Sequence, residues 1–223
     1  MKGRSALIKA VIFDLDGVLV TTDEYHYVAW KKLADDHHIP FERADYGQFR
    51  GVSRADCVDI LVKKAGRAYS EAEKAALAAE KNAVYVSLLA GLDQRAVLPG
   101  AIDTLRALRE ADIKTAVGSA SKNTRFILDK LSLTALFDAI ADGTMVKKSK
   151  PDPEVFLKAA AMLDVLPDNC LVAEDAVAGL MAAKSGGMRT LGVGPAKDDP
   201  LADISAQTLA DIDLKAMIQN HLI

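Results

Sequence analysis

Two aspartates, two residues apart, are the first residues in this chain whose types and spacing suggest chemistry. Asp14 and Asp16 follow the apolar run Ala10–Phe13, which predicts a short buried strand, and Gly17 lets the chain turn away. In an extended segment, residues i and i+2 point to the same side, so both carboxylates can face one small volume. Two such charges repel each other unless a divalent cation lies between them or one carries a proton. The pair therefore indicates a metal site or a general acid, although aspartates also cap ordinary turns.

Three further polar segments stand where other predicted strands end. They are residues 119–123 (Ser-Ala-Ser-Lys-Asn), residues 149–153 (Ser-Lys-Pro-Asp-Pro) and Glu174-Asp175. Taken singly, each has an ordinary structural explanation: a serine turn, a solvated lysine, and an acidic helix N-terminus. Together they offer hydroxyls and amides for a phosphate oxygen, a point cation in a stiff loop, and a second acidic pair.

The elements that must position these groups follow from the apolar pattern. Beyond Leu98, short apolar runs alternate with helical patterns, and strands are predicted around 115–118, 139–141, 171–173 and 191–193. Helices are predicted between them, with Pro153 opening one and a closing helix over 214–222. Such alternation predicts an α/β fold with a doubly wound parallel sheet that binds ligands beyond the carboxyl ends of its strands.

Residues 23–96 break this rhythm because they contain helical patterns and no convincing strand. Ser53 is placed to cap one helix, and Ser70 with Glu73 has the form of a capping box before an alanine-rich helix. We therefore expect an all-helical cap domain over 23–96, inserted into a core built from 1–22 and 97–223.

Composition restricts the partners. The 223 residues carry a net charge of −3 and are 50% hydrophobic, which gives no electrostatic reason to expect nucleic acid. No apolar run is long enough to span a bilayer and no signal peptide is visible, so we expect a cytoplasmic protein without a membrane partner. Cys57 and Cys170 are expected to be buried thiols. A monomer is the preferred assembly.

The four polar segments resemble the signature motifs of the haloacid dehalogenase superfamily, which are matched by Asp14-x-Asp16-Gly17, Ser119, Lys150 and Glu174-Asp175. That resemblance implies a Rossmann-like core with a helical cap of the C1 type. Within the superfamily the chain is most similar to the β-phosphoglucomutase family. The segments that carry this closer resemblance are 13–18, Glu24-Tyr25-His26 with Trp30, 51–54, Lys81-Asn82 with Tyr85, 98–100, 119–123 and 137–142.

By this resemblance, Asp14 is the nucleophile that becomes an aspartyl phosphate, and Asp16 is the general acid and base. Ser119 and Lys150 would hold the transferring phosphoryl group. One Mg²⁺ per chain would be bound by the Asp14 carboxylate, the Asp16 backbone carbonyl, Glu174 and Asp175.

The cap would supply selectivity for a sugar phosphate. Arg54 would grip the phosphate that is not transferred, while His26 and Lys81 would link cap closure to the placement of Asp16. The expected substrate-binding residues are His26, Trp30, Gly51, Val52, Ser53, Arg54, Lys81, Ser119, Ala120, Ser121, Lys122 and Asn123. Glu80 is expected to make the cap rim more acidic.

The reaction implied is the interconversion of β-D-glucose 1-phosphate and D-glucose 6-phosphate. It would pass through an aspartyl-phosphate enzyme and β-glucose 1,6-bisphosphate, with glucose 1,6-bisphosphate as the priming phosphate donor. Two other functions stay open: a sugar-phosphate phosphatase on the same scaffold, and a non-catalytic sugar-phosphate sensor, which would have no need of Asp16.

Overall fold

A six-stranded parallel sheet forms the centre of the molecule, which we describe from a computed structural model over residues 7–50 and 52–223. The strand order is β3-β2-β1-β4-β5-β6. The strands are β1 (Ala10–Phe13), β2 (Lys114–Gly118), β3 (Ala139–Ala141), β4 (Cys170–Glu174), β5 (Arg189–Val193) and β6 (Ile204–Ala206). The order reverses direction beside β1, so the crevice where such sheets bind ligands lies at its carboxyl end.

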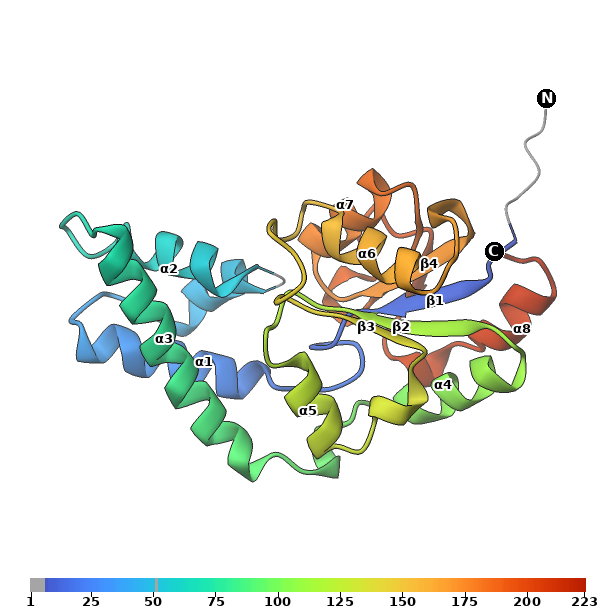
Figure 1. Cartoon of the computed structure of the whole chain (residues 1–223), viewed down its shortest axis with the longest axis horizontal. Coiled ribbons are helices and arrows are strands. Elements are labelled where there is room, and N and C mark those ends of the chain that lie inside the picture. Colours follow the sequence, from blue (N-terminus) through green and yellow to red (C-terminus); the bar gives the residue numbers. More distant parts are fainter. Residues whose placement is uncertain (1–6, 51) are drawn as a thin grey trace.

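Helices cover both faces of the sheet (Figure 1). Val11 and Phe13 of β1 pack with α4, α5 and α8 on one face, whereas Ala10 and Ile12 pack with α6 and α7 on the other. The helices are α4 (Ala101–Glu110), α5 (Thr124–Lys130), α6 (Glu154–Met162), α7 (Val177–Ser185) and α8 (Leu214–Gln219). Burial on both faces explains why the strands are apolar throughout rather than alternating.

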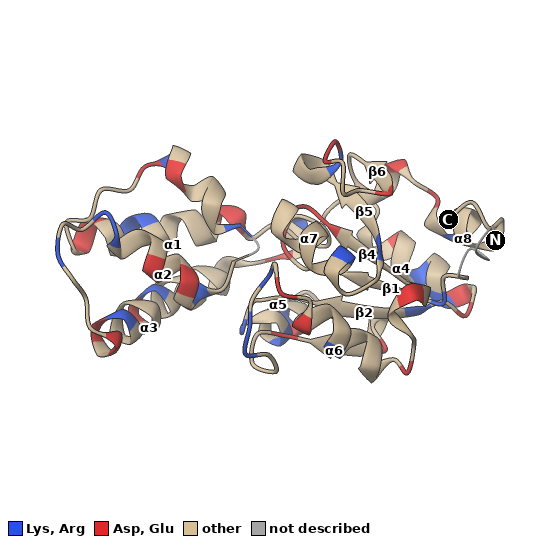
Figure 2. Ribbon diagram, turned by 90° about the horizontal axis from the view of Figure 1, so that it is seen from above, with Lys and Arg blue, Asp and Glu red and all other residues tan. Residues whose placement is uncertain are grey.

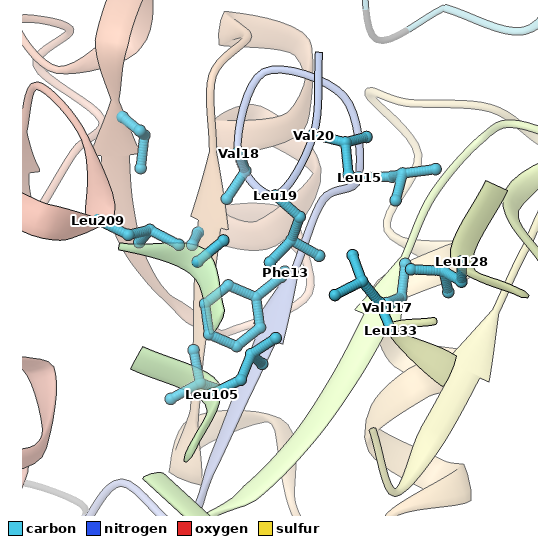
Figure 3. Close-up of a cluster of buried hydrophobic side chains, with 14 of the residues drawn as sticks. Phe13, Leu15, Val18, Leu19, Val20, Leu105, Val117, Leu128, Leu133 and Leu209 are labelled. Carbon is cyan, nitrogen blue, oxygen red and sulfur yellow. The ribbon is translucent and has the colours of Figure 1, made fainter. Parts of the chain in front are cut away.

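The segment after β1 is fixed by apolar contacts. Its side chains lie in the same apolar cluster as Phe13, on one side of that ring (Figure 3), and are almost fully buried: Leu15, Val18, Leu19 and Val20. Burying each such side chain contributes about 2 kcal/mol, so the backbone that carries Asp14 and Asp16 has little freedom.

A helical unit lies apart from the sheet at its carboxyl edge (Figure 1). It comprises α1 (Asp23–Asp36), the 3₁₀ helix η1 (Arg43–Phe49), α2 (Arg54–Val62) and α3 (Glu71–Leu88). It has its own apolar cluster, which includes Trp30, Phe49 and Leu61. Ser53 caps α2, and Ser70 forms the expected capping box at α3. The predicted fold class, an α/β core with an inserted all-helical cap, is confirmed, while the exact boundaries at 22/23 and 96/97 remain a prediction.

The local structure differs from the sequence analysis in two places, one strand that was missed and one helix that was predicted too long. Strand β6 was not predicted, because Ile204-Ser205-Ala206 is too short and too polar to stand out. The closing helix ends at Gln219, and Leu222 lies beyond it with 68% of its surface exposed. The two cysteines are buried free thiols, as expected.

Charge is distributed over the whole molecule. Figure 2 shows acidic and basic residues on both the helical unit and the sheet layer. Within the described residues, no helix combines the length and apolar character that a membrane span requires.

Candidate active site

A cavity of about 890 Å³ lies between the carboxyl edge of the sheet and the helical unit. Most predicted site residues line it: Asp14, Asp16, His26, Trp30, Val52, Ser53, Arg54, Lys81, Ser119, Ala120, Ser121, Lys122, Lys150 and Asp175. Glu174 and Asn123 do not line it, because Glu174 is fully buried beneath and the Asn123 amide donates to Asn82 Oδ1 at 2.9 Å. Gly51 lies outside the described residues.

Lys150 is the buried cation of the site. Its Nζ donates to Asp14 Oδ1 at 2.7 Å and to Glu174 Oε1 at 2.5 Å. Burial disfavours the ammonium form, but the charges of the two carboxylates outweigh it and hold the pKa of Lys150 above its ordinary value. The cation therefore stays charged at neutral pH and fixes Asp14 by one oxygen. In the described part of the chain nothing hydrogen-bonds Asp14 Oδ2, which is left free on the cavity side.

Three carboxylates meet around this lysine. Each of Asp14, Glu174 and Asp175 offers an oxygen within 4.8 Å of the others. Burial, with repulsion from Glu174, raises the pKa of Asp14 to about 7 although Lys150 lowers it. Burial and repulsion from Glu174 and Asp14 raise the pKa of Asp175 to about 8. Three carboxylates and one ammonium leave two negative charges, which a divalent cation would neutralise.

The donor set fits a hard cation such as Mg²⁺. The backbone makes room for the acids, since a Cβ on Gly17, whose φ is +79°, would lie 2.1 Å from Asp175 Oδ2, and one on Gly179 would lie 1.9 Å from Glu174 Oε1. Glu174 is the most engaged of the three, because its Oε2 also accepts from the Ala176 amide at 2.9 Å. Asp14 and Asp175 are therefore the better placed side-chain ligands.

Asp16 is held away from this cluster, toward the helical unit. Its Oδ1 accepts from the Thr22 amide at 2.9 Å and from the Thr22 hydroxyl at 2.5 Å, and His26 Nε2 lies 3.6 Å from its Oδ2. Burial alone would raise the pKa of Asp16, but His26 and Thr22 outweigh it and leave the pKa below its ordinary value. The two carboxylates of the opening motif thus have different surroundings and suit different roles.

Behind Asp16, the helical unit supplies a chain of polar contacts. Lys81 Nζ lies 2.7 Å from His26 Nδ1, and the His26 ring stacks on Tyr85 with centroids 3.9 Å apart. Burial, together with the charge of Arg54, lowers the pKa of Lys81 to about 7. Trp30 is 2% exposed and belongs to the apolar cluster of the helical unit as well as to the cavity wall.

Groups suited to phosphate oxygens line the opposite walls of the cavity. Ser119 Oγ and Ser121 Oγ each accept a backbone N–H at 3.2 Å, and neither hydroxyl donates to another group of residues 7–50 or 52–223, so both protons can be donated to a ligand. Arg54 forms no hydrogen bond or ion pair within the described residues, and burial lowers its pKa. An arginine left unpaired in a cavity is suited to binding an anion.

Some contacts of the site had not been predicted. Thr22 is the last residue before the predicted helical domain, yet it holds Asp16, and no local pattern reveals a contact across a turn. Arg50, on the cavity wall, is paired with Asp23. Glu80 is not a cavity residue, because it pairs with His37 at 2.9 Å on the outside of the helical unit.

Comparison with known proteins gives consistent similarities. The family model for haloacid dehalogenase-like hydrolases matches residues 8–187. The chain is 41% identical to a β-phosphoglucomutase of Bacillus subtilis over 94% of both sequences, and 31% identical to a phosphorylated carbohydrates phosphatase of Thermotoga maritima, covering 91% of this chain and 93% of that one. The crystal structure of a β-phosphoglucomutase from Clostridium difficile superposes with a TM-score of 0.90 at 36% identity, over 97% of this chain and 99% of that one.

Proposed function

Because this chain belongs to the haloacid dehalogenase-like hydrolase family, we propose that it is a β-phosphoglucomutase that interconverts β-D-glucose 1-phosphate and D-glucose 6-phosphate. One observation carries this proposal: an aspartate with a free oxygen and an unpaired arginine from the helical unit line the same cavity. A substrate with two phosphates needs both groups, one to accept a phosphoryl group and one to bind the phosphate that stays.

Asp14 Oδ2 attacks the phosphorus of a priming bisphosphate, and the bond from phosphorus to the sugar oxygen breaks. Lys150 keeps Asp14 oriented through Oδ1, and Ser119 donates to the transferring group. Asp16 supplies the proton to the leaving sugar oxygen. The aspartyl phosphate then passes its phosphoryl group to the 6-hydroxyl of β-glucose 1-phosphate, while Asp16 takes the proton of that hydroxyl. The resulting bisphosphate turns over, and its 1-phosphate returns to Asp14.

Arg54, with Ser121 and Lys122, is proposed to hold the distal phosphate while either end of the sugar faces Asp14. We assign to His26 and Lys81 the role of coupling phosphate binding by the helical unit to the position of Asp16, since Lys81 contacts His26 and His26 contacts Asp16. The sugar phosphates are charged and do not cross bilayers, so we expect a cytoplasmic enzyme. We also expect a monomer, because one chain supplies every group named above.

Mg²⁺ is the proposed cofactor, with Asp14, Asp175, Glu174 and the Asp16 backbone carbonyl as its expected ligands. When bound, it would neutralise charge on the phosphoryl oxygens.

Metal removal is expected to abolish turnover, because the acidic cluster would then repel the phosphoryl group. A readout without turnover tests the same site: Mg²⁺ at 100 times its dissociation constant should stabilise the folded protein by about 2.7 kcal/mol in urea unfolding. An Asp175→Ala variant should lose that stabilisation, whereas Asp103→Ala, on the exposed side of α4, should keep it. Activity that survives complete chelation would exclude the metal's role.

A coupled assay tests the function itself. With β-glucose 1-phosphate and a trace of glucose 1,6-bisphosphate, glucose 6-phosphate should form far faster than inorganic phosphate, and omission of the bisphosphate should leave a lag. The α-anomer serves as the control and should not be converted. Release of phosphate without isomerisation would instead identify a sugar-phosphate phosphatase, and absence of both reactions would indicate a sensor.

A further inference from the structure

One side-chain hydrogen bond joins the helical unit to the loop that carries Lys150. Ser149 Oγ donates to Asp56 Oδ2, and both residues line the cavity. The same carboxylate oxygen accepts from Ser53 Oγ at 2.6 Å, and the Asp56 amide donates back to Ser53 Oγ at 3.3 Å. Asp56 is therefore held by the N-terminal turn of α2 and is not a freely rotating surface acid.

The two partners sit beside residues that the proposed reaction uses. Asp56 is in the first turn of α2, two residues after Arg54, so the rigid helix ties their positions together. Ser149 directly precedes Lys150, whose Nζ holds Asp14. This contact thus connects the helix that carries the proposed distal-phosphate residue Arg54 to the loop whose lysine holds the nucleophile.

Charge favours this contact. Lys147 and Lys148 precede Ser149, have exposed side chains and line the same cavity. Lys148 is also paired with Asp152 at 3.2 Å, and Asp56 is itself exposed, so the attraction between this loop and the Asp56 carboxylate is modest and screened by salt. A second contact, between Asn82 and Asn123, also joins the helical unit to a loop at the carboxyl edge of the sheet.

We propose that Asp56 and Ser149 form a closure clasp, a pair of positioning residues that holds the helical unit against the Lys150 loop while Asp14 carries a phosphoryl group. This inference rests on the proposed function. Closure keeps water from the aspartyl phosphate, so the clasp sets how often the phosphoryl group passes to sugar rather than to water.

The test compares phosphate release with isomerisation in Asp56→Asn, Ser149→Ala and the double variant. Loss of a hydrogen bond to a charged group should raise the ratio of phosphate released to glucose 6-phosphate formed by about tenfold. The double variant should be no worse than either single variant, because both remove the same contact. Ser149→Thr keeps the hydroxyl and should restore the wild-type ratio.

Asp59→Asn is the matched control, since Asp59 lies on the same helix but pairs with Lys74 inside the helical unit at 2.8 Å. It should leave the ratio unchanged. Small-angle scattering of the full chain with glucose 6-phosphate and Mg²⁺ adds a readout without turnover, and Asp56→Asn should be less compact than wild type.

The clasp is overturned if wild type isomerises but the clasp variants keep the wild-type ratio of phosphate to glucose 6-phosphate and the wild-type scattering. It is also overturned if the two single substitutions change that ratio additively in the double variant, or if Asp59→Asn changes it as Asp56→Asn does. A wild type that never isomerises refutes the proposed function instead. Scattering then still decides whether the clasp closes the molecule.

Discussion

An Asp14→Ala variant is expected to lose about 10⁴-fold or more in kcat, because the acceptor of the phosphoryl group is gone and no other group can replace it. The nearest carboxylates are unsuited to take over. Glu174 has both oxygens engaged, Asp175 is a proposed metal ligand, and Asp16 points toward Thr22 and His26. The loss should appear in kcat and equally in the burst of covalently bound phosphate, which should vanish.

The same variant is expected to fold. Removing one of three crowded carboxylates relieves repulsion, and Lys150 retains Glu174 as a partner, so stability without metal should match or exceed that of wild type. Urea unfolding measures this, and Asp103→Ala provides the control for kcat and folding. Retained turnover, or phosphate bound covalently elsewhere, would show that the nucleophile is misassigned.

A Lys150→Met variant is expected to lose both activity and stability. Its kcat should fall by about 10²–10³-fold, because the cation that orients Asp14 and faces the phosphoryl group is absent. Its free energy of unfolding should fall by about 3–5 kcal/mol, because Asp14 and Glu174 are left buried and unpaired. Activity assays and urea unfolding measure the two losses separately.

A second substitution separates these effects. Adding Glu174→Gln to Lys150→Met removes one unpaired charge and should restore part of the stability but not the rate. Lys215→Met, which breaks a solvent-facing ion pair with Glu110, is the control and should change neither. If Lys150→Met is as stable and active as this control, the central role of Lys150 is wrong.

Much of the fold could be predicted because its signals are local. Strands β1 to β5 are short apolar runs, the pattern that a parallel sheet buried on both faces requires, and β1 to β4 are each followed by polar residues. The Ser53 and Ser70 caps were predictable for the same reason, since a cap bonds within its own turn. Strand β6 was not, because its three residues have no pattern of their own and pair only where β5 presents an edge.

The sequence by itself determined which residue types gather at the carboxyl edge of the sheet, because the strand ends that bear Asp14, Ser119, Lys150 and Glu174-Asp175 can be located along the chain. Only the tertiary structure shows that these groups have different surroundings. Thr22 draws Asp16 toward the helical unit, Lys150 ties Asp14 to Glu174, and Ser149 meets Asp56. These contacts join residues up to 136 positions apart, and no local pattern encodes a distance across the fold. The spacing of Asp14 and Asp16 predicts that the two carboxylates lie close together. That one lies beside Lys150 and the other beside Thr22 and His26 follows from how the helical unit and the loops pack against the sheet.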